Sequence, residues 1–344
     1  MALDADGRPS LVSAPLGDAV EVALATDRTL DVVAVEAPSY GSALEDASAA
    51  ATTTTTIPAP TDPLVSQQWA LSSFAFNALW PSGRGAGVTV AVVDTGVQAD
   101  HPDFDARVLP GISIHGGVLR AGGGSTDPNG HGTHVAGIIG AGENTTGIVG
   151  VAPEVTILPV QVLGSDGKGL NSDIGCGITW AAANGASVIN VSIGSDTNSA
   201  SVSTAVDYAV SRGAVVVAAA GNGGPNGPPR YPAALPNTVA VGALGTSGGI
   251  ASYSTNGDYV DVAAPGSAIL STYPPATWKN DSGTSMSSPH VAALAALLID
   301  IRGPITPAAM VARLTSTATD AGPTGFDPAY GWGRINPVGA LNAP

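Results

Sequence analysis

From about residue 62 onward, short apolar runs alternate with helix-like segments along the chain. The apolar runs are rich in Val and Ile and stop at a glycine or a polar residue, a pattern typical of strands that are buried on both faces. The predicted strands lie at residues 88–96, 156–164, 187–194, 214–222 and 237–244, and the predicted helices at 133–141, 172–186, 201–213, 288–301 and 306–317.

This alternation predicts an α/β fold in three layers, with a doubly wound, mostly parallel sheet and helices on both of its faces. In such sheets, the side chains that bind or react gather beyond the carboxyl ends of the strands. The polar residues that follow the predicted strands are therefore the first candidates for chemistry.

Residues 1–60 differ from the rest of the chain. Two strand-like runs, at 19–25 and 30–37, flank the turn-like tetrapeptide TDRT and predict a hairpin. The low-complexity stretch 47–60 contains five consecutive threonines and predicts an exposed linker. We therefore divide the chain into an N-terminal extension, residues 1–60, and a main domain, residues 61–344.

Composition narrows the classes of function. The 344 residues are 44% hydrophobic and 11% charged, and the net charge at pH 7 is −15. Nucleic-acid binding is not expected, because phosphate groups require a basic surface. The single cysteine, Cys176, excludes an internal disulfide, and its apolar surroundings favour an inert buried thiol over a reactive one.

The sequence carries no signal for a membrane or for export. No apolar run approaches the ~20 residues that span a bilayer, so no membrane span is expected. The first residues, MALDADGRPSLVS, lack the basic and apolar regions of a signal peptide. We expect a secreted protein whose signal has been removed, with a cytoplasmic location as the alternative that the sequence leaves open.

Four polar residues stand at strand ends and helix starts: Asp94, His131, Asn222 and Ser285. Acyl transfer requires a base for the serine proton, a carboxylate that orients the base, and a donor for the developing oxyanion. Each residue also has a plainer interpretation. Asp94 and Asn222 could be turn residues, Ser285 a helix cap, and His131 with His134 a metal site. Their conjunction favours the acyl-transfer site.

Three segments, VAVVDTG, NGHGTHVAG and SGTSMSSPHVA, resemble in that order the signature blocks of the subtilases, the subtilisin-like serine endopeptidases. The order Asp, His, Ser is the known order of that family. The resemblance covers residues 62–341, and DTGVQADHPDF and NTTGI are similar to its thermitase-like branch. It implies that Asp94 orients His131, which acts as general base and then acid. Ser285 would be the nucleophile, and Asn222 would donate to the oxyanion with the Ser285 N–H.

The resemblance also implies how a substrate is held. Two edges would pair with an extended peptide, and small residues would line the pocket for the side chain before the scissile bond. These residues are Ser192, Ile193 and Gly194 for one edge, Gly164, Ser165 and Asp166 for the other, and Ala219, Ala220 and Gly221 for the pocket. Arg230 falls near the base of that pocket, where it would either point to solvent or favour an acidic or polar side chain.

A structural calcium ion is expected from the same resemblance. Three side chains and three backbone carbonyls match an oxygen-rich site, which suits a hard cation. The side chains are those of Asp62, Asp103 and Asn144, and the carbonyls those of Gly142, Thr146 and Ile148. The alternative is a polar loop over residues 143–147 that holds no metal. No cofactor is needed for the chemistry itself.

The family comparison leaves two further points open. Residues 1–60 resemble an inhibitory pro-segment in position but not in motif, so a short pro-segment and a permanent extension both remain. A catalytically silent scaffold that binds extended peptides is the alternative function, although all four chemical positions hold the expected residues. We expect protein or peptide substrates and a monomer that binds neither nucleic acid nor membrane.

Overall fold

The computed structural model describes residues 2–3, 9–10 and 60–344. The hairpin predicted at residues 19–37 lies outside the described residues, as does the predicted linker up to residue 59. The fold and the candidate site are therefore drawn from the main domain.

The chain divides into two units, Met1–Pro58 and Ala59–Pro344. In the first unit, β1 (Ala2–Leu3) and β2 (Pro9–Ser10) form a short antiparallel pair. All other described elements belong to the second unit, so that unit carries the sheet and every residue of the candidate site.

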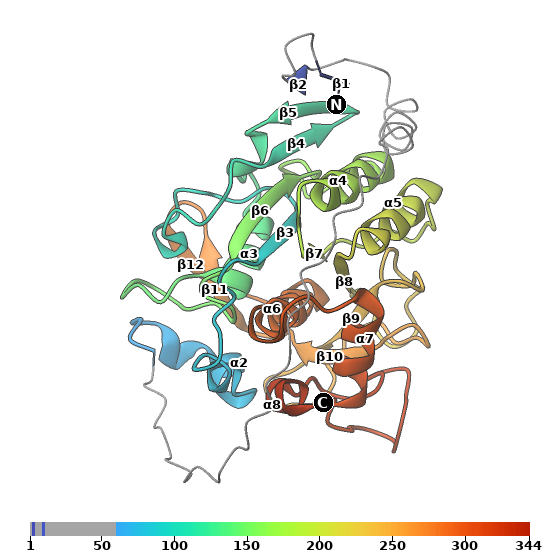
Figure 1. The fold of residues 1–344 in the computed structure, drawn as a ribbon. Coiled ribbons are helices and arrows are strands. Elements are labelled where there is room, and N and C mark those ends of the chain that lie inside the picture. The colour runs from blue at the N-terminus through green and yellow to red at the C-terminus, as the bar shows by residue number, and fades with distance from the viewer. Residues whose placement is uncertain (1, 4–8, 11–59) are drawn as a thin grey trace, which may run out of the picture. The chain divides into compact units, whose positions relative to one another are not determined.

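An eight-stranded sheet forms the centre of the second unit (Figure 1). Its strands are β3 (Thr89–Asp94), β4 (Ile112–His115), β5 (Val118–Ala121), β6 (Thr156–Gln161), β7 (Val188–Val191), β8 (Val215–Ala219), β9 (Val239–Leu244) and β10 (Val262–Pro265). The order is β10-β9-β8-β7-β3-β6-β4-β5, and only β4 and β5 pair antiparallel. The parallel neighbours of β3 are β6 on one side and β7 on the other, so the strand order switches from one side of β3 to the other. In parallel sheets a site is expected beyond the carboxyl end of the strand at such a switch point.

Helices cover both faces of this sheet and complete the three layers. The helical elements are α2 (Trp69–Ser73), α3 (His131–Gly140), α4 (Asn171–Ala183), α5 (Ala200–Ser211), α6 (Thr284–Arg302), α7 (Pro307–Ser316) and α8 (Pro337–Asn342). Short 3-10 turns occur at η1 (Val65–Gln67), η2 (Phe76–Ala78), η3 (Pro102–Phe104) and η4 (Gly123–Ser125). A separate antiparallel hairpin joins β11 (Ile269–Tyr273) to β12 (Thr277–Asp281).

The alternation of side chains along β3 shows how the two faces are filled. Val90 and Val92 pack into the core that contains α3 and α6, whereas Ala91 and Val93 pack into the core that contains α4 and α5. All four are fully buried, as a central parallel strand requires. The predicted three-layer α/β fold is confirmed.

Each strand and helix predicted beyond residue 62 is present, with ends that differ by a few residues. The largest difference is at α6, which begins at Thr284 instead of residue 288. The pattern did not predict the hairpins β4–β5 and β11–β12. The residues of β5 are all exposed and those of β12 are exposed or half-buried, so neither strand carries a buried apolar run.

By length and composition alone, one described helix could cross a membrane, namely α6. Most of it is buried inside the protein, and Leu294, Leu297 and Leu298 are fully enclosed. A central core helix meets the same criteria, so the finding is weak support for a membrane span. This buried helix holds Ser285 in its first turn.

Candidate active site

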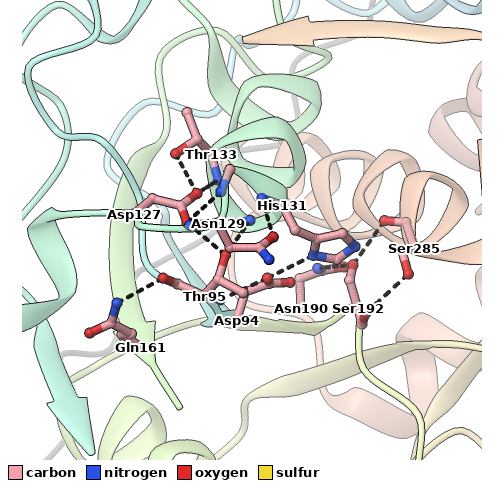
Figure 2. Close-up of polar contacts among 12 residues, drawn as sticks. Asp94, Thr95, Asp127, Asn129, His131, Thr133, Gln161, Asn190, Ser192 and Ser285 are labelled. Carbon is pink, nitrogen blue, oxygen red and sulfur yellow. Dashed lines mark hydrogen bonds and ion pairs between the residues drawn. The ribbon is translucent and has the colours of Figure 1, made fainter. Parts of the chain in front are cut away.

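The carboxylate of Asp94 and the imidazole of His131 form the first part of the site. Asp94 is the last residue of β3 and is fully buried, and His131 is the first residue of α3. Their Nδ1 and Oδ1 atoms lie 2.7 Å apart. A carboxylate only accepts, so Nδ1 carries the proton, and Nε2 of the neutral ring is left as a base. Figure 2 shows the ring lying between Asp94 and Ser285.

The electrostatic surroundings strengthen the basicity of this histidine. Burial alone would lower the pKa of His131, but the negative charge of Asp94 and its hydrogen bond act in the opposite direction. The charges of Asp281 and Asp127 add to them, so the pKa of His131 is raised above its ordinary value. The protonated form of the ring is therefore stabilised at this position.

Ser285 lies at the second position of α6, where the helix leaves backbone N–H groups unpaired. Its hydroxyl donates to the carbonyl oxygen of Ser192 at 3.1 Å, directly beyond the end of β7. The Ser192 hydroxyl in turn donates to the carbonyl of Ser285 at 2.9 Å, and Asn190 donates to the Ser192 hydroxyl at 2.8 Å. This double contact fixes the serine against the sheet.

Two hydrogen-bond donors converge beside this serine. The Asn222 Oδ1 accepts from the backbone N–H and the hydroxyl of Thr284, both at 2.9 Å. Because a backbone N–H must meet an oxygen, this contact fixes the amide orientation and turns the Asn222 Nδ2 the other way. A Cβ built on Gly283 would lie 3.2 Å from that Nδ2 and 3.7 Å from the backbone nitrogen of Ser285. Both nitrogens therefore border the small space left by the missing side chain of Gly283.

An acidic residue that the sequence analysis missed lies behind His131. The carboxylate of Asp127 accepts hydrogen bonds from the start of α3 and from Thr95, the residue after Asp94 (Figure 2). Asp127 lies four residues before His131, in a loop with the sequence DPNG. The spacing of an acidic residue just before a helix start was the available signal.

The Subtilase family model matches residues 85–333, which is most of the chain. The chain belongs to the subtilase family. The resemblance expected from the three sequence blocks is therefore confirmed. This subtilase is a serine endopeptidase, a peptide hydrolase whose substrates are proteins or peptides.

Individual relatives and a solved structure agree with that assignment. The subtilase is 44% identical over 256 residues to subtilisin DY of Bacillus licheniformis, which covers 74% of this chain and 90% of the relative. It is 45% identical over 241 residues to thermitase of Thermoactinomyces vulgaris, covering 70% and 85%. A protease structure from Pseudoalteromonas arctica superposes with a TM-score of 0.76 and 33% identity, covering 82% of this chain and 98% of that one.

The two predicted substrate edges of the subtilase differ in whether their backbone groups are free. Within the described part of the chain, the backbone groups of Ile193 and Gly194 have no hydrogen-bond partner, which leaves them available to an added strand. The opposite edge is not extended. Gly164 donates its N–H to the carbonyl of Lys168 and accepts from Gly167, whose φ of +72° closes a turn. Residues 164–168 thus form a turn in which both backbone groups of Gly164 are used internally, and pairing of residues 164–166 with a substrate stays a prediction.

Arg230 lies beside the predicted pocket rather than away from it. A Cβ added at Gly194 would meet the Arg230 Cβ at 3.3 Å, and one added at Gly221 would collide with the Arg230 Cγ. The guanidinium forms an ion pair with Asp196 and keeps 27% of its side chain exposed. Ala219 and Ala220 are buried behind it. The stem of Arg230 thus fills the space between Gly194 and Gly221, and its charge is already paired.

The six residues predicted for calcium are brought into one network. The Asp62 Oδ1 accepts from the N–H groups of Asn144 and Thr146, at 3.0 and 3.3 Å. The Asp103 Oδ2 accepts from the N–H of Ile148, and the N–H of Gly142 donates to the Asp103 carbonyl. The remaining oxygens, Asp62 Oδ2 and Asp103 Oδ1, are buried without a partner among the described residues. Burial, with the charges of Asp62 and Asp105, raises the pKa of Asp103 to about 6.

Two unpartnered buried carboxylate oxygens fit a cation. Among the described residues, no three His, Cys, Asp or Glu side chains form a cluster, so the two acidic groups would need further oxygens. Backbone carbonyls and the Asn144 amide supply that kind of oxygen, which Ca²⁺ accepts and transition metals disfavour.

The three other histidines near the site have structural roles. His134 contacts the carbonyls of Ile269 and Lys279 through Nε2, and burial lowers its pKa to about 4. His290 contacts the carbonyl of Met286 through Nδ1, and burial lowers its pKa to about 4 as well. His101 contacts the carbonyl of Thr277. Each imidazole thus anchors a backbone segment and remains neutral at pH 7.

Proposed function

We propose that this subtilase hydrolyses peptide bonds through an acyl-enzyme intermediate formed on Ser285. His131 Nε2 takes the hydroxyl proton as Ser285 Oγ attacks the peptide carbonyl. The proton then passes to the leaving amine, the C–N bond breaks, and the acyl group remains on the serine. A water molecule, deprotonated by the same imidazole, attacks the ester and restores the hydroxyl. Asp94 holds the ring in the required tautomer throughout.

The observation that carries this proposal is the convergence around Ser285. The 2.7 Å contact between Asp94 and His131 supports the base, and the two donors at Gly283 support stabilisation of the oxyanion. A hydroxyl at the start of α6 is also where the helix dipole favours negative charge. The helix-cap interpretation of Ser285 and the catalytic one are therefore compatible.

Labelling with a fluorophosphonate tests this assignment against a silent peptide-binding scaffold. The wild-type protein is expected to incorporate one label per chain and to cleave an unfolded protein substrate. Ser285→Ala should do neither, while Ser282→Ala, which alters an exposed neighbouring hydroxyl, should do both. Equal labelling of wild type and Ser285→Ala would contradict the proposal.

An extended peptide would add a strand along residues 192–194. The unpaired backbone groups of Ile193 and Gly194 support this pairing, which recognises the main chain and tolerates many sequences. The side chain before the scissile bond would enter toward Ala219, Ala220 and Gly221. The Arg230 stem limits the depth of that pocket.

Specificity for this side chain then depends on the Arg230–Asp196 ion pair. An acidic side chain would compete with Asp196 for the guanidinium, and an apolar one would pack on the stem. We compare kcat/KM for matched peptides that carry Glu or Phe before the scissile bond. Arg230→Ala should raise the preference for Phe, and Asp196→Asn should raise the preference for Glu. No change in either ratio would exclude a role for Arg230.

Ca²⁺ is proposed as a structural ion held by Asp62, Asp103 and Asn144 together with the carbonyls of residues 142, 146 and 148. When bound, it neutralises two buried carboxylates and links the loop after α3 to η3 and the N-terminal part of the domain. The test is the thermal midpoint with calcium and with a chelator. The midpoint should fall on chelation in wild type and respond little in Asp103→Asn. An unchanged wild-type midpoint would contradict the site.

Residues 1–60 are proposed as an N-terminal pro-segment that inhibits the domain and is removed near Thr61, so that a secreted, monomeric domain of residues 61–344 results. The low-complexity sequence before Thr61 supports a cleavable linker. Intact mass after incubation tests the removal. The mass of wild type should fall by about the mass of residues 1–60, and the mass of Ser285→Ala should stay that of the full chain. Size-exclusion chromatography with light scattering tests whether the processed domain is a monomer. Equal masses would favour a permanent extension.

A further inference from the structure

Asp127 accepts five hydrogen bonds, more than its place in an exposed loop would suggest. Its Oδ1 accepts from the Thr95 hydroxyl at 2.8 Å and from the N–H groups of Asn129 and Gly130 at 3.1 and 2.8 Å. Its Oδ2 accepts from the N–H and the hydroxyl of Thr133, at 2.8 and 2.7 Å. These donors saturate both oxygens, so Asp127 has no capacity left for a ligand. Its role must lie in what it holds together.

Two of those donors, Thr95 and Thr133, belong to the segments that carry Asp94 and His131. Thr95 follows Asp94 at the end of β3, and its N–H donates to the Asp94 Oδ1 at 2.8 Å. Its hydroxyl also accepts from the N–H of Gly132, which follows His131, at 2.9 Å. The Gln161 amide holds the carbonyl of Thr95 from β6 at 2.9 Å. Thr95 therefore bridges the end of β3 to the start of α3, and Asp127 orients the bridging hydroxyl (Figure 2).

On the helix side, Asp127 replaces a missing cap. Gly130 is the residue before α3 and has a φ of +100°, and its position offers no side-chain cap. The Oδ2 of Asp127 accepts from the N–H of Thr133, the third helical residue, as a capping oxygen would. The backbone N–H of His131 is held by the Asn129 Oδ1 at 3.2 Å. The direction in which α3 leaves the loop, and so the place of the His131 ring, depends on these contacts.

We propose that Asp127 is a positioning residue that ties the end of β3, with Asp94, to the start of α3, with His131. The inference rests on the proposed function, because only a catalytic His131 gives that placement a chemical consequence. The negative charge of Asp127 has a second role, because it helps to stabilise the protonated imidazole. The anions that raise the pKa of His131 are Asp94, Asp281 from β12, and Asp127.

The test compares Asp127→Asn with Asp207→Asn, a matched loss of a surface carboxylate that binds only the Asn237 amide among the described residues. Active sites are counted with the fluorophosphonate, so that kcat refers to folded enzyme. Asp127→Asn should lower kcat by about 10- to 100-fold with KM little changed, because the base is displaced rather than the substrate. The acid limb of the pH profile should move to lower pH, since one anion is lost. Asp207→Asn should match wild type in both.

A second pair of variants tests the bridge itself and serves if Asp127→Asn does not fold. Thr95→Val removes the hydroxyl between Asp127 and Gly132, and Thr95→Ser restores it. Thr95→Val should lower kcat and Thr95→Ser should recover most of it. In the combined Asp127→Asn, Thr95→Val protein, the loss should be smaller than the product of the two single losses, because both interrupt one link.

A merely structural role predicts a different outcome. A lower thermal midpoint with kcat per active site within threefold of wild type and an unmoved acid limb would overturn the proposal. The low-field proton resonance of the His131–Asp94 hydrogen bond, recorded in a Ser285→Ala background, needs no activity. A shifted or faster-exchanging signal in Asp127→Asn supports positioning, and an unchanged signal overturns it even if the proposed function itself fails.

Discussion

The two proposed oxyanion donors, the Asn222 side-chain amide and the Ser285 N–H, give the sharpest quantitative prediction. Asn222→Ala removes the Nδ2 that faces the space beside Gly283 and leaves the Ser285 N–H as the remaining donor. For a subtilisin, removal of one such donor costs about 2.7–4 kcal/mol, or roughly 10²–10³-fold in kcat. The same loss is expected here, because the Asn222 amide is fixed by two hydrogen bonds and needs no reorganisation as charge develops. KM should change little, since the donor acts mainly in the transition state.

Thr284→Val separates donation from orientation. It removes the hydroxyl that anchors the Asn222 Oδ1 and accepts from the Gly221 N–H, but it keeps the backbone anchor and the Nδ2 donor. One hydrogen bond contributes about 0.5–1.5 kcal/mol, so kcat should fall by roughly 2- to 12-fold.

The assay is kcat and KM on a chromogenic peptide, with active sites counted by fluorophosphonate titration. Asn237→Ala, which removes an exposed amide that contacts Asp207, is the control and should match wild type. A kcat within threefold of wild type for Asn222→Ala, or a larger loss in Thr284→Val than in Asn222→Ala, would refute the assignment of Asn222 as the oxyanion donor.

Three further outcomes follow from the same geometry. Gly283→Ala should lower kcat with little change in thermal midpoint, because its Cβ would lie 3.2 Å from the Asn222 Nδ2. An unchanged kcat would refute the assignment of the oxyanion to the space beside Gly283. The pKa of His131 is raised, and only the neutral ring accepts a proton, so kcat/KM should fall as pH drops through a value above 6.5; a midpoint at or below 6.5 would contradict this. Leu294→Ala, at a fully buried position of α6, should cost about 2–5 kcal/mol of unfolding free energy in urea, and a smaller loss would mean that the cavity collapses.

The sequence by itself determined the architecture and predicted four candidate positions for the chemistry. Strands that are buried on both faces must be apolar at every position, so the strand pattern was visible without any tertiary information. Asp94 is the last residue of such a strand, and Asn222 lies three residues beyond another. The parallel topology brings these ends to one edge of the sheet. Ser285 stood out among the neighbouring serines only in conjunction with Asp94, His131 and Asn222, and its place at a helix start agrees with that interpretation because free N–H groups and the helix dipole favour negative charge there.

Only the tertiary structure decided the details that depend on side-chain placement between distant segments. The bridge from Asp127 through Thr95 joins residues 32 positions apart, and the Arg230–Asp196 pair joins residues 34 positions apart. Neither leaves a periodic signal, because each depends on where two loops meet. The turn at residues 164–168 was missed for a related reason. A glycine-rich segment is compatible with an extended edge or a closed turn, and the hydrogen bond between Gly164 and Lys168 selects the turn.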